Sequence, residues 1–144
     1  MKNFKAGIYI KSTTALIGSF FENTTILLVK HNEEGTIGLV TNKPFEKSLN
    51  ELIEFNQSKP FPLKDGGPVD REHLFVLHKR PDLIDGGIQI TNGYYLGGNM
   101  GQVIETINTS DANTEEIQLF IGYCGWDTGE LEAELEEESW TIVY

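Results

Sequence analysis

The chain has 144 residues and a mass of 16.2 kDa, the ordinary size of one domain, so we expect a single domain spanning residues 1–144. With 39% hydrophobic residues and only 5 prolines, the composition excludes an intrinsically disordered chain. The single cysteine, Cys124, excludes an intrachain disulfide and a cysteine-based structural zinc site, which fits a reducing cytoplasm.

The formal net charge of −11 is divided unevenly along the chain. Residues 1–80 hold all 11 Lys and Arg with 9 acidic residues, whereas residues 81–144 hold 13 acidic residues and no basic one. Nucleic-acid binding depends on clustered Lys and Arg, and no basic stripe interleaved with aromatic residues is present, so the charge disfavours direct DNA binding. The apolar run Ala6–Ile10 is too short for a signal core or a membrane span, so we expect a soluble, unprocessed protein with no membrane partner.

Three strands are predicted near the start of the chain. Residues Ala6–Ile10 form the first, and Thr24–His31 form a second that is apolar on both faces and therefore internal to a sheet. The turn Asn32–Gly35 leads into Thr36–Thr41, which completes a hairpin.

A helix and a long loop are expected next. Ser48 with Glu51 three residues on is a capping box that predicts a helix of two to three turns. Gln57–Val69 is rich in Lys, Pro and Gly and is expected to be the longest loop.

The second half of the chain predicts more strands. Leu74–Leu77 and Ile117–Cys124 are buried strands, and Trp140–Tyr144 closes the chain as another. Ile88–Leu96 is a hairpin, because its central Asn-Gly pair tolerates the positive φ angles of a tight turn.

Two further helices are expected, one capped by Asn99 and a short one capped by Asp127 with Glu130. Strands outnumber helices and mostly follow one another through short turns. The sequence therefore predicts an α+β fold with a largely antiparallel sheet and about three short helices.

Common catalytic and cofactor motifs are absent, including the phosphate loop, His-Glu-x-x-His, Gly-x-Ser-x-Gly and Cys-x-x-Cys. Gly97–Gly101 resembles an incomplete phosphate cradle, but glycines at such a turn usually only form the turn. The acidic run Asp127–Glu138 is typical of a solvated face rather than a metal cage, so no metal or cofactor is predicted. Cys124, within an apolar strand, is expected to be a small core residue.

Two histidines and one glycine-flanked segment are the candidates for function. His31 and His78 each end a strand, where an imidazole serves either as an acid, base or ligand, or as a hydrogen-bond partner of the adjacent loop. In Gly122–Trp126, two glycines flank aromatic residues at the end of a strand, where a regular strand would avoid glycine. This pattern implies close backbone approach, by a ligand or by another segment of the chain.

Four blocks of the sequence carry a resemblance to a known family: residues 21–44, Gly66–Val69, Leu77-His78, and Gly122–Trp126 continuing to Ser139-Trp140. By these blocks, which span nearly the whole chain, the sequence resembles the YqgE/AlgH family of small, biochemically uncharacterised bacterial proteins. The resemblance implies a compact α+β domain with a strongly bent sheet, a pseudo-barrel.

The same resemblance implies little about activity. The family's label of transcriptional regulator rests on an association with alginate regulation and not on a DNA-binding motif. This sequence departs from the family with Lys43 where Arg is usual, Cys124 where Ala is usual and Glu130 where Gln is common, which argues further against a catalytic thiol.

Our leading hypothesis is a cytoplasmic, non-enzymatic regulatory or binding protein that acts through a protein partner or a small ligand, with an indirect role in transcription. The candidate surface gathers polar, aromatic and glycine positions: His31, Asn32, Asn42, Gly66, Gly67, His78, Tyr123, Trp126 and Glu130. The alternative is an enzyme that uses His31 or His78 as acid or base with Asp127 or Glu130. A direct DNA-binding regulator ranks third because of the charge.

Overall fold

The sheet of this protein curls back on itself. The computed structural model describes residues 5–91, 93–109 and 113–143. The strands in these ranges are β1 (Tyr9–Ser12), β2 (Thr25–Asn32), β3 (Gly35–Val40), β4 (Pro44–Ser48), β5 (Pro62–Asp65), β6 (Val69–His78), β7 (Ile88–Thr91), β8 (Tyr94–Leu96), β9 (Ile117–Asp127) and β10 (Trp140–Val143). They pair in the order β10-β1-β2-β3-β9-β6-β8-β7, and β5 joins β4 to β9. All pairs are antiparallel except β5 with β9, so the expected α+β fold with a strongly bent, largely antiparallel sheet is confirmed.

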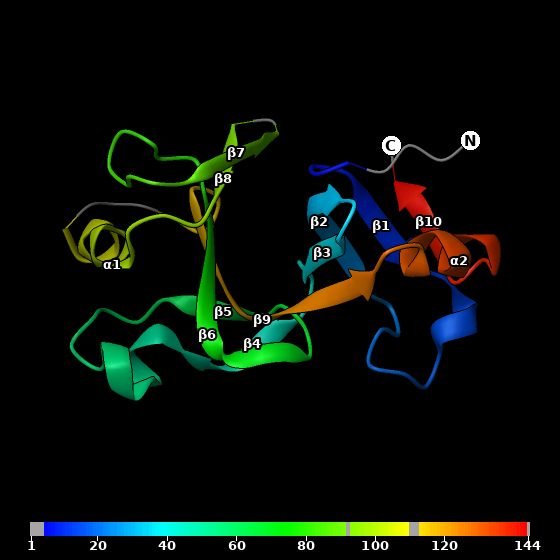
Figure 1. Cartoon of the computed structure of the whole chain (residues 1–144). Helices are drawn as coiled ribbons and strands as arrows, with labels where there is room; N and C mark the ends of the chain where they lie inside the picture. The colour runs from blue at the N-terminus through cyan, green and yellow to red at the C-terminus, as the bar shows by residue number, and fades with distance from the viewer. Residues whose placement is uncertain (1–4, 92, 110–112, 144) are drawn as a thin grey trace.

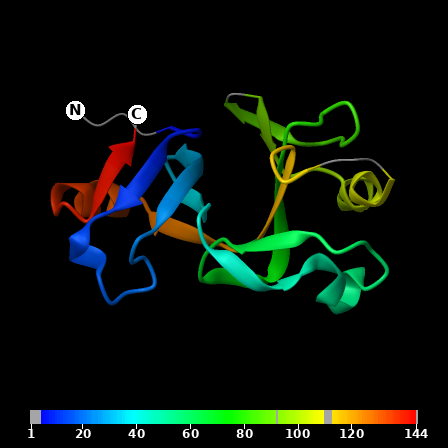
Figure 2. The same cartoon turned by 180° about the vertical axis from the view of Figure 1, so that it is seen from behind.

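Strand β9 is the spine that joins the two halves of the molecule (Figure 1). Its last residues pair with β3, and its first residues lie between β6 and β5. Gly122, between these two stretches, has a φ of 73°, a value that a regular strand does not adopt. The backbone therefore bends at this glycine, and the two halves lie on either side of the bend (Figure 2).

Each half has its own apolar core. In the half with β1, β2 and β10, the core includes Ile26, Leu131 and Trp140, and in the other half it includes Leu63, Val103 and Leu119. 

A third cluster lies between the halves and is centred on Leu27, Leu77 and Phe120. Tyr9 of β1 and Tyr94 of β8 both pack against it, although their strands lie near opposite ends of the sheet. Curling of the sheet thus brings Tyr9 near Tyr94, and burial, together with this neighbour, raises the pKa of Tyr9.

Two α-helices cover the halves, α1 (Met100–Thr109) and α2 (Glu130–Glu136). The predicted cap of α1 is confirmed, because Asn99 Oδ1 accepts a hydrogen bond from the Gln102 amide at 2.9 Å. Neither α1 nor α2, the α-helices of the described ranges, has the length and apolar character that crossing a bilayer requires.

Two expectations for residues 48–69 are wrong. Glu51 does accept a hydrogen bond from the Ser48 amide at 2.9 Å, but the chain then forms only the 3-10 turns Leu49–Glu51 and Ile53–Phe55 instead of an α-helix. The expected loop Gln57–Val69 contains strand β5, which is held by its parallel pairing with β9. The hairpin of β7 and β8 is confirmed with Gly93 at a φ of 80°, while Asn92 lies outside the described residues.

Candidate functional site

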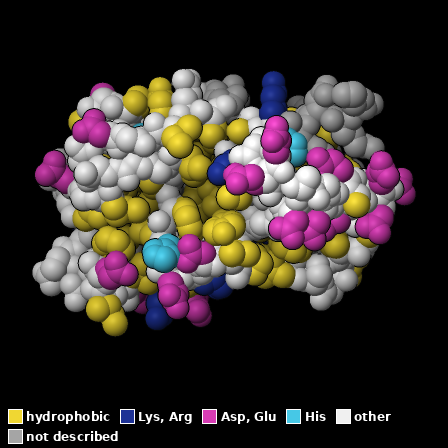
Figure 3. Space-filling model, in the orientation of Figure 1, with side chains coloured by type: hydrophobic (Ala, Val, Ile, Leu, Met, Phe, Trp, Pro, Cys, Tyr) yellow, Lys and Arg dark blue, Asp and Glu magenta, His cyan; other side chains and the backbone are white. Residues whose placement is uncertain are grey.

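A groove of about 400 Å³ opens on the sheet where β2, β3 and β9 approach one another. Its lining combines apolar, charged and glycine positions: Lys30, Asn32, Glu34, Gly35, Thr36, Ile37, Val69, Tyr123, Gly125, Trp126 and Asp127. On the face shown in Figure 3, apolar side chains gather in the hollow between the two halves, whereas acidic side chains gather over α2. The groove's volume of about 400 Å³ lies in the size range of small-molecule sites.

Two glycines create this groove. Strand pairing places Lys30, Ile37 and Gly125 side by side in one row across the sheet. The next row on the same face consists of Asn32, Gly35 and Asp127. Because one member of each row has no side chain, the sheet is hollowed between the flanking side chains.

The two glycines differ in what the fold requires. A Cβ atom on Gly35 would lie 2.2 Å from the carbonyl oxygen of Trp126, so no larger residue fits there. A Cβ atom on Gly125 would have its nearest neighbour 3.5 Å away, at Cε1 of Tyr123, which is ordinary contact. Gly125 is also exposed, so packing within the described residues does not demand a glycine at this position.

At Gly122, unlike at Gly125, the fold itself requires a glycine. A Cβ atom on Gly122 would lie 2.3 Å from the carbonyl oxygen of Gly67, and one on Gly67 would lie 2.2 Å from the carbonyl oxygen of Tyr123. The segment that contains Gly66 and Gly67 therefore crosses β9 in direct backbone contact. The sequence left open whether a ligand or another segment approaches Gly122–Trp126, and at Gly122 it is another segment.

The aromatic wall of the groove is Tyr123. Its ring is half-buried and packs edge to face on Phe75, with ring centroids 5.5 Å apart. This contact holds the ring beside the open backbone of Gly125.

His31 and Trp126 point to the other face of the sheet, toward α2. His31 Nδ1 lies 2.6 Å from Thr36 Oγ1, and its Nε2 lies 3.9 Å from Glu132 of α2. The indole nitrogen of Trp126 donates to Glu134 of α2 at 3.0 Å. Trp126 is among the residues that line the groove, but the residue is only 8% exposed and belongs to the core behind it.

Glu130 and Asn42 hold local structure. Glu130 accepts a hydrogen bond from the Asp127 amide at 2.5 Å, which secures the turn before α2. Asn42 accepts from the Thr25 amide at 3.0 Å and donates to the Asn23 carbonyl at 2.9 Å. Neither residue is part of the groove lining.

His78 lies at the far end of β6, in the other half of the molecule. It is fully buried, stacks on Tyr95 with centroids 5.7 Å apart, and accepts a hydrogen bond from the Arg80 amide through Nδ1 at 3.0 Å. Burial lowers the pKa of His78, an effect that the Gly97 carbonyl and Asp82 oppose. 

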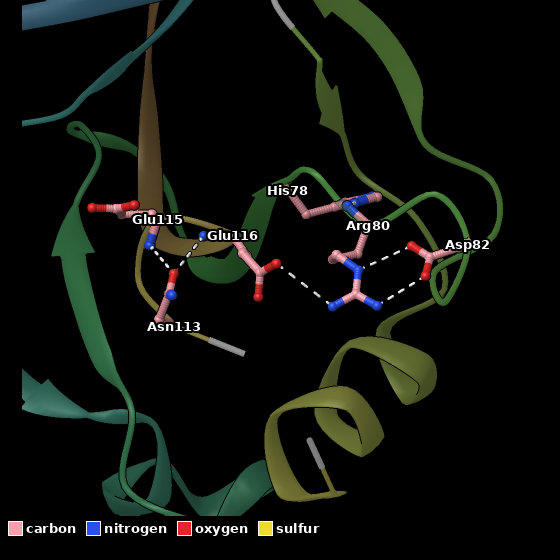
Figure 4. Close-up of polar contacts among 6 residues, drawn as sticks. All are labelled: His78, Arg80, Asp82, Asn113, Glu115 and Glu116. Atoms are coloured by element: carbon pink, nitrogen blue, oxygen red, sulfur yellow. Dashed lines mark hydrogen bonds and ion pairs between the residues drawn. The ribbon is translucent and has the colours of Figure 1, made fainter. Parts of the chain in front are cut away.

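Figure 4 shows the ion pairs beside His78, in which Arg80 contacts Asp82 at 2.8 Å and Glu116 at 3.6 Å. Asn113 Oδ1 accepts hydrogen bonds from the amides of Glu115 and Glu116 and holds the chain that enters β9. Arg80, Asp82 and Glu116 are thus engaged with one another.

Cys124 is 1% exposed, and burial raises the pKa of its thiol to about 12. Its Sγ donates to the Gly66 carbonyl at 3.5 Å, so the sulfur is a core group at the crossing of β9. Within residues 5–91, 93–109 and 113–143, no group of three or more His, Cys, Asp and Glu side chains is arranged to hold a metal ion.

Of the groove lining, the sequence predicts Asn32, Tyr123 and Trp126 as candidate surface and Asp127 in the enzyme alternative, but not Lys30, Ile37 and Val69. The missing signal for two of these was the hairpin register, because Lys30 and Ile37 pair directly across β2 and β3. Val69 comes from β6, and only the crossing of the chain over β9 brings it near.

Comparison with known proteins identifies the family. The AlgH-like family, DUF179, matches residues 9–144. The chain belongs to this family. A UPF0301 protein of Chlorobaculum tepidum is 40% identical over 136 residues, which cover 94% of this chain and 73% of that protein. A UPF0301 protein of Bacteroides fragilis is 38% identical over 123 residues, covering 85% of this chain and 62% of that one.

Two solved structures resemble this AlgH-like chain. The solution structure of AlgH from Pseudomonas aeruginosa matches with a TM-score of 0.76 and 26% identity, over 99% of this chain and 80% of AlgH. A crystal structure of a Corynebacterium diphtheriae protein matches with a TM-score of 0.79 and 20% identity, over 99% and 76% of the two chains. The second likeness shows the shared fold alone.

Proposed function

We propose that this AlgH-like protein is a non-catalytic binding protein whose ligand occupies the groove at the end of β2, β3 and β9. The observation that carries the proposal is the open position at Gly125. Tyr123 stands on one side of this position, and Ile37 and then Lys30 lie across the sheet in the same row.

Glycine is a costly choice in a paired strand. It loses the most conformational entropy on folding and contributes no cross-strand packing, and a β-branched residue at such a site stabilises a sheet by up to about 1 kcal/mol relative to it. The nearest neighbour of a Cβ atom is 3.5 Å away, so the space exists for a larger residue. Packing among the described residues does not require glycine at position 125, and the open space that this glycine leaves is suited to a bound ligand.

The positions of the two histidines support a binding function over catalysis. The acid–base hypothesis needs His31 or His78 beside Asp127 or Glu130. His78 is fully buried in the other half, and His31 faces Glu132 on the α2 side of the sheet, away from the groove. The carboxylate of Glu130 is engaged with the Asp127 amide.

A protein that binds a ligand without converting it can act by changing its own contacts with a partner, and we propose this mode of action for the chain. We therefore place the chain in the regulatory class, with any effect on transcription exerted through a protein. The acidic surface over α2 would repel a phosphate backbone, which supports the indirect route (Figure 3).

A thermal-shift screen with nucleotides, amino acids, common metabolites and divalent metals tests the proposal. A ligand at 100 times its dissociation constant stabilises a protein by about 2.7 kcal/mol, or roughly 5–10 °C here. We expect at least one compound to shift the wild type and the control Thr141→Val, which alters an exposed position of β10, but not Gly125→Val. Compounds that shift Gly125→Val equally, or that the protein converts to product, would contradict the proposal.

A further inference from the structure

We infer that the ligand of the groove is a free aromatic α-amino acid, a molecule that carries one ring, one ammonium and one carboxylate group. This inference rests on the proposed function and adds the chemical class of the ligand. Three features of the groove support it: its charges, its aromatic wall and the spacing of its rows.

The groove presents charges of both signs that do not pair with each other. Lys30, Glu34 and Asp127 all line it, and none of the three forms an ion pair within 4.0 Å with another described residue. A purely anionic ligand would meet two carboxylates, and a purely cationic one would meet the lysine. A zwitterion can satisfy both signs at once.

The placement of these charges suits two groups on one carbon atom. Lys30 lies in one row and Asp127 in the next, two strands away, and between them stands Gly35, which has no side chain. Strands lie about 4.8 Å apart and same-face rows about 6.7 Å apart, so a small head group above Gly35 is reached by the long lysine from one side and the aspartate from the other. A carboxylate and an ammonium attached to the same carbon atom fit between Lys30 and Asp127.

The remaining part of the groove suits a flat ring. Gly125 leaves the backbone of β9 uncovered, Tyr123 stands beside it, and Ile37 is its direct partner on β3. A ring placed over Gly125 would contact the edge of the tyrosine and the isoleucine side chain, an arrangement that aromatic pairs favour.

Calorimetric titration with three indole compounds tests the inference. L-tryptophan carries both charges, tryptamine only the ammonium, and indole-3-propionate only the carboxylate. We expect L-tryptophan to bind the wild type, and each single-charge compound to bind at least about tenfold more weakly, since each lacks a charged contact.

Two variants assign the charges. Lys30→Gln should weaken the binding of L-tryptophan about tenfold and leave the affinity for tryptamine unchanged. Asp127→Asn should weaken the binding of L-tryptophan and leave the affinity for indole-3-propionate unchanged. Lys11→Gln, at an exposed position of β1, is the matched control and should bind like the wild type. Far-ultraviolet circular dichroism of each variant checks that it is folded.

Equal affinity for the three compounds, or tighter binding of the dipeptide Trp-Gly than of L-tryptophan, would overturn the inference. If L-tryptophan, L-phenylalanine and L-tyrosine all fail to bind but another compound loses binding in Gly125→Val, the proposed function stands and the amino-acid assignment falls. If Gly125→Val changes the binding of no compound, both fall.

Discussion

Trp126 and Trp140 meet edge to face, with ring centroids 6.1 Å apart, and their indole nitrogens donate to the same oxygen of Glu134 at 3.0 and 2.9 Å. One carboxylate on α2 thus joins the ends of β9 and β10. Leu131 and Leu135 of the same helix pack into the core that contains both tryptophans. This arrangement fixes α2 to the back of the sheet that carries the groove.

Removing this carboxylate is expected to destabilise the fold. Glu134→Ala leaves two indole N–H groups without an acceptor and should lower the free energy of unfolding by about 2–4 kcal/mol. Glu134→Gln retains an oxygen acceptor and should cost about half as much. Urea unfolding followed by tryptophan fluorescence measures both, with the exposed Glu136→Ala as the control. A Glu134→Ala protein as stable as the control would show that the shared contact contributes nothing.

Gly67 at the crossing and Gly125 in the groove should respond oppositely to alanine. A Cβ atom on Gly67 would overlap the backbone of Tyr123, so Gly67→Ala should destabilise by at least about 2 kcal/mol or prevent folding. Gly125→Ala meets only ordinary contact and should keep or raise the midpoint of thermal unfolding. Differential scanning calorimetry decides the point, and a large loss in Gly125→Ala would show that the fold needs this glycine.

His78 should make the protein sensitive to acid. Burial lowers its pKa from 6.5 in the folded state, so the unfolded chain binds a proton at this site more readily. The free energy of unfolding should therefore fall as the pH drops below 6.5 toward the lowered folded-state value. In His78→Asn, whose amide oxygen can still accept from the Arg80 amide, this fall should be smaller. Urea titrations between pH 5 and 7 measure it.

His73 is the matched control for this experiment. Its hydrogen bond to Asp70, at 2.5 Å, raises the pKa of His73, so its contribution to stability is present below pH 6.5 and is lost as the pH rises through the raised value. His73→Asn should retain or steepen the fall in stability at acid pH. If His78→Asn falls as steeply as the wild type, buried His78 does not cause the acid sensitivity.

Cys124 should be chemically inert in the folded protein. Burial leaves 1% of it exposed and raises its thiol pKa to about 12, so almost no thiolate exists at pH 8. Ellman's reagent should release no colour from the native protein at pH 8 and one equivalent in 6 M guanidinium chloride. Prompt labelling of the native protein would mean that the crossing of β9 opens readily.

Features with local causes could be predicted from the sequence. The β7–β8 hairpin depends on a turn beside its own strands, and the cap of α1 depends on Asn99 and Gln102, three residues apart. The apolar runs of β2 and β9 indicated strands buried on both faces, which the structure confirms. In the site, Asn32 and Tyr123 could be selected because they lie at a strand end and beside a glycine.

Features that depend on contacts between distant residues could not be predicted from the sequence. Strand β5 exists because Leu63 pairs with Leu119, and the 3-10 turn at Leu49 is held by the hydrogen bond of its amide to the Phe61 carbonyl. In both cases the partner is remote in sequence or lies across a loop, and the hydrophobic periodicity of a short window does not reveal such a partner.

The sequence by itself determined the α+β class, the acidic second half and the unusual pair of glycines in Gly122–Trp126. Only the tertiary structure decided what each glycine does. Gly122 is in contact with the Gly67 backbone, whereas Gly125 faces an open groove. The physical reason is that the space available to a Cβ atom depends on which distant segment crosses it, and that crossing exists only once the sheet has curled.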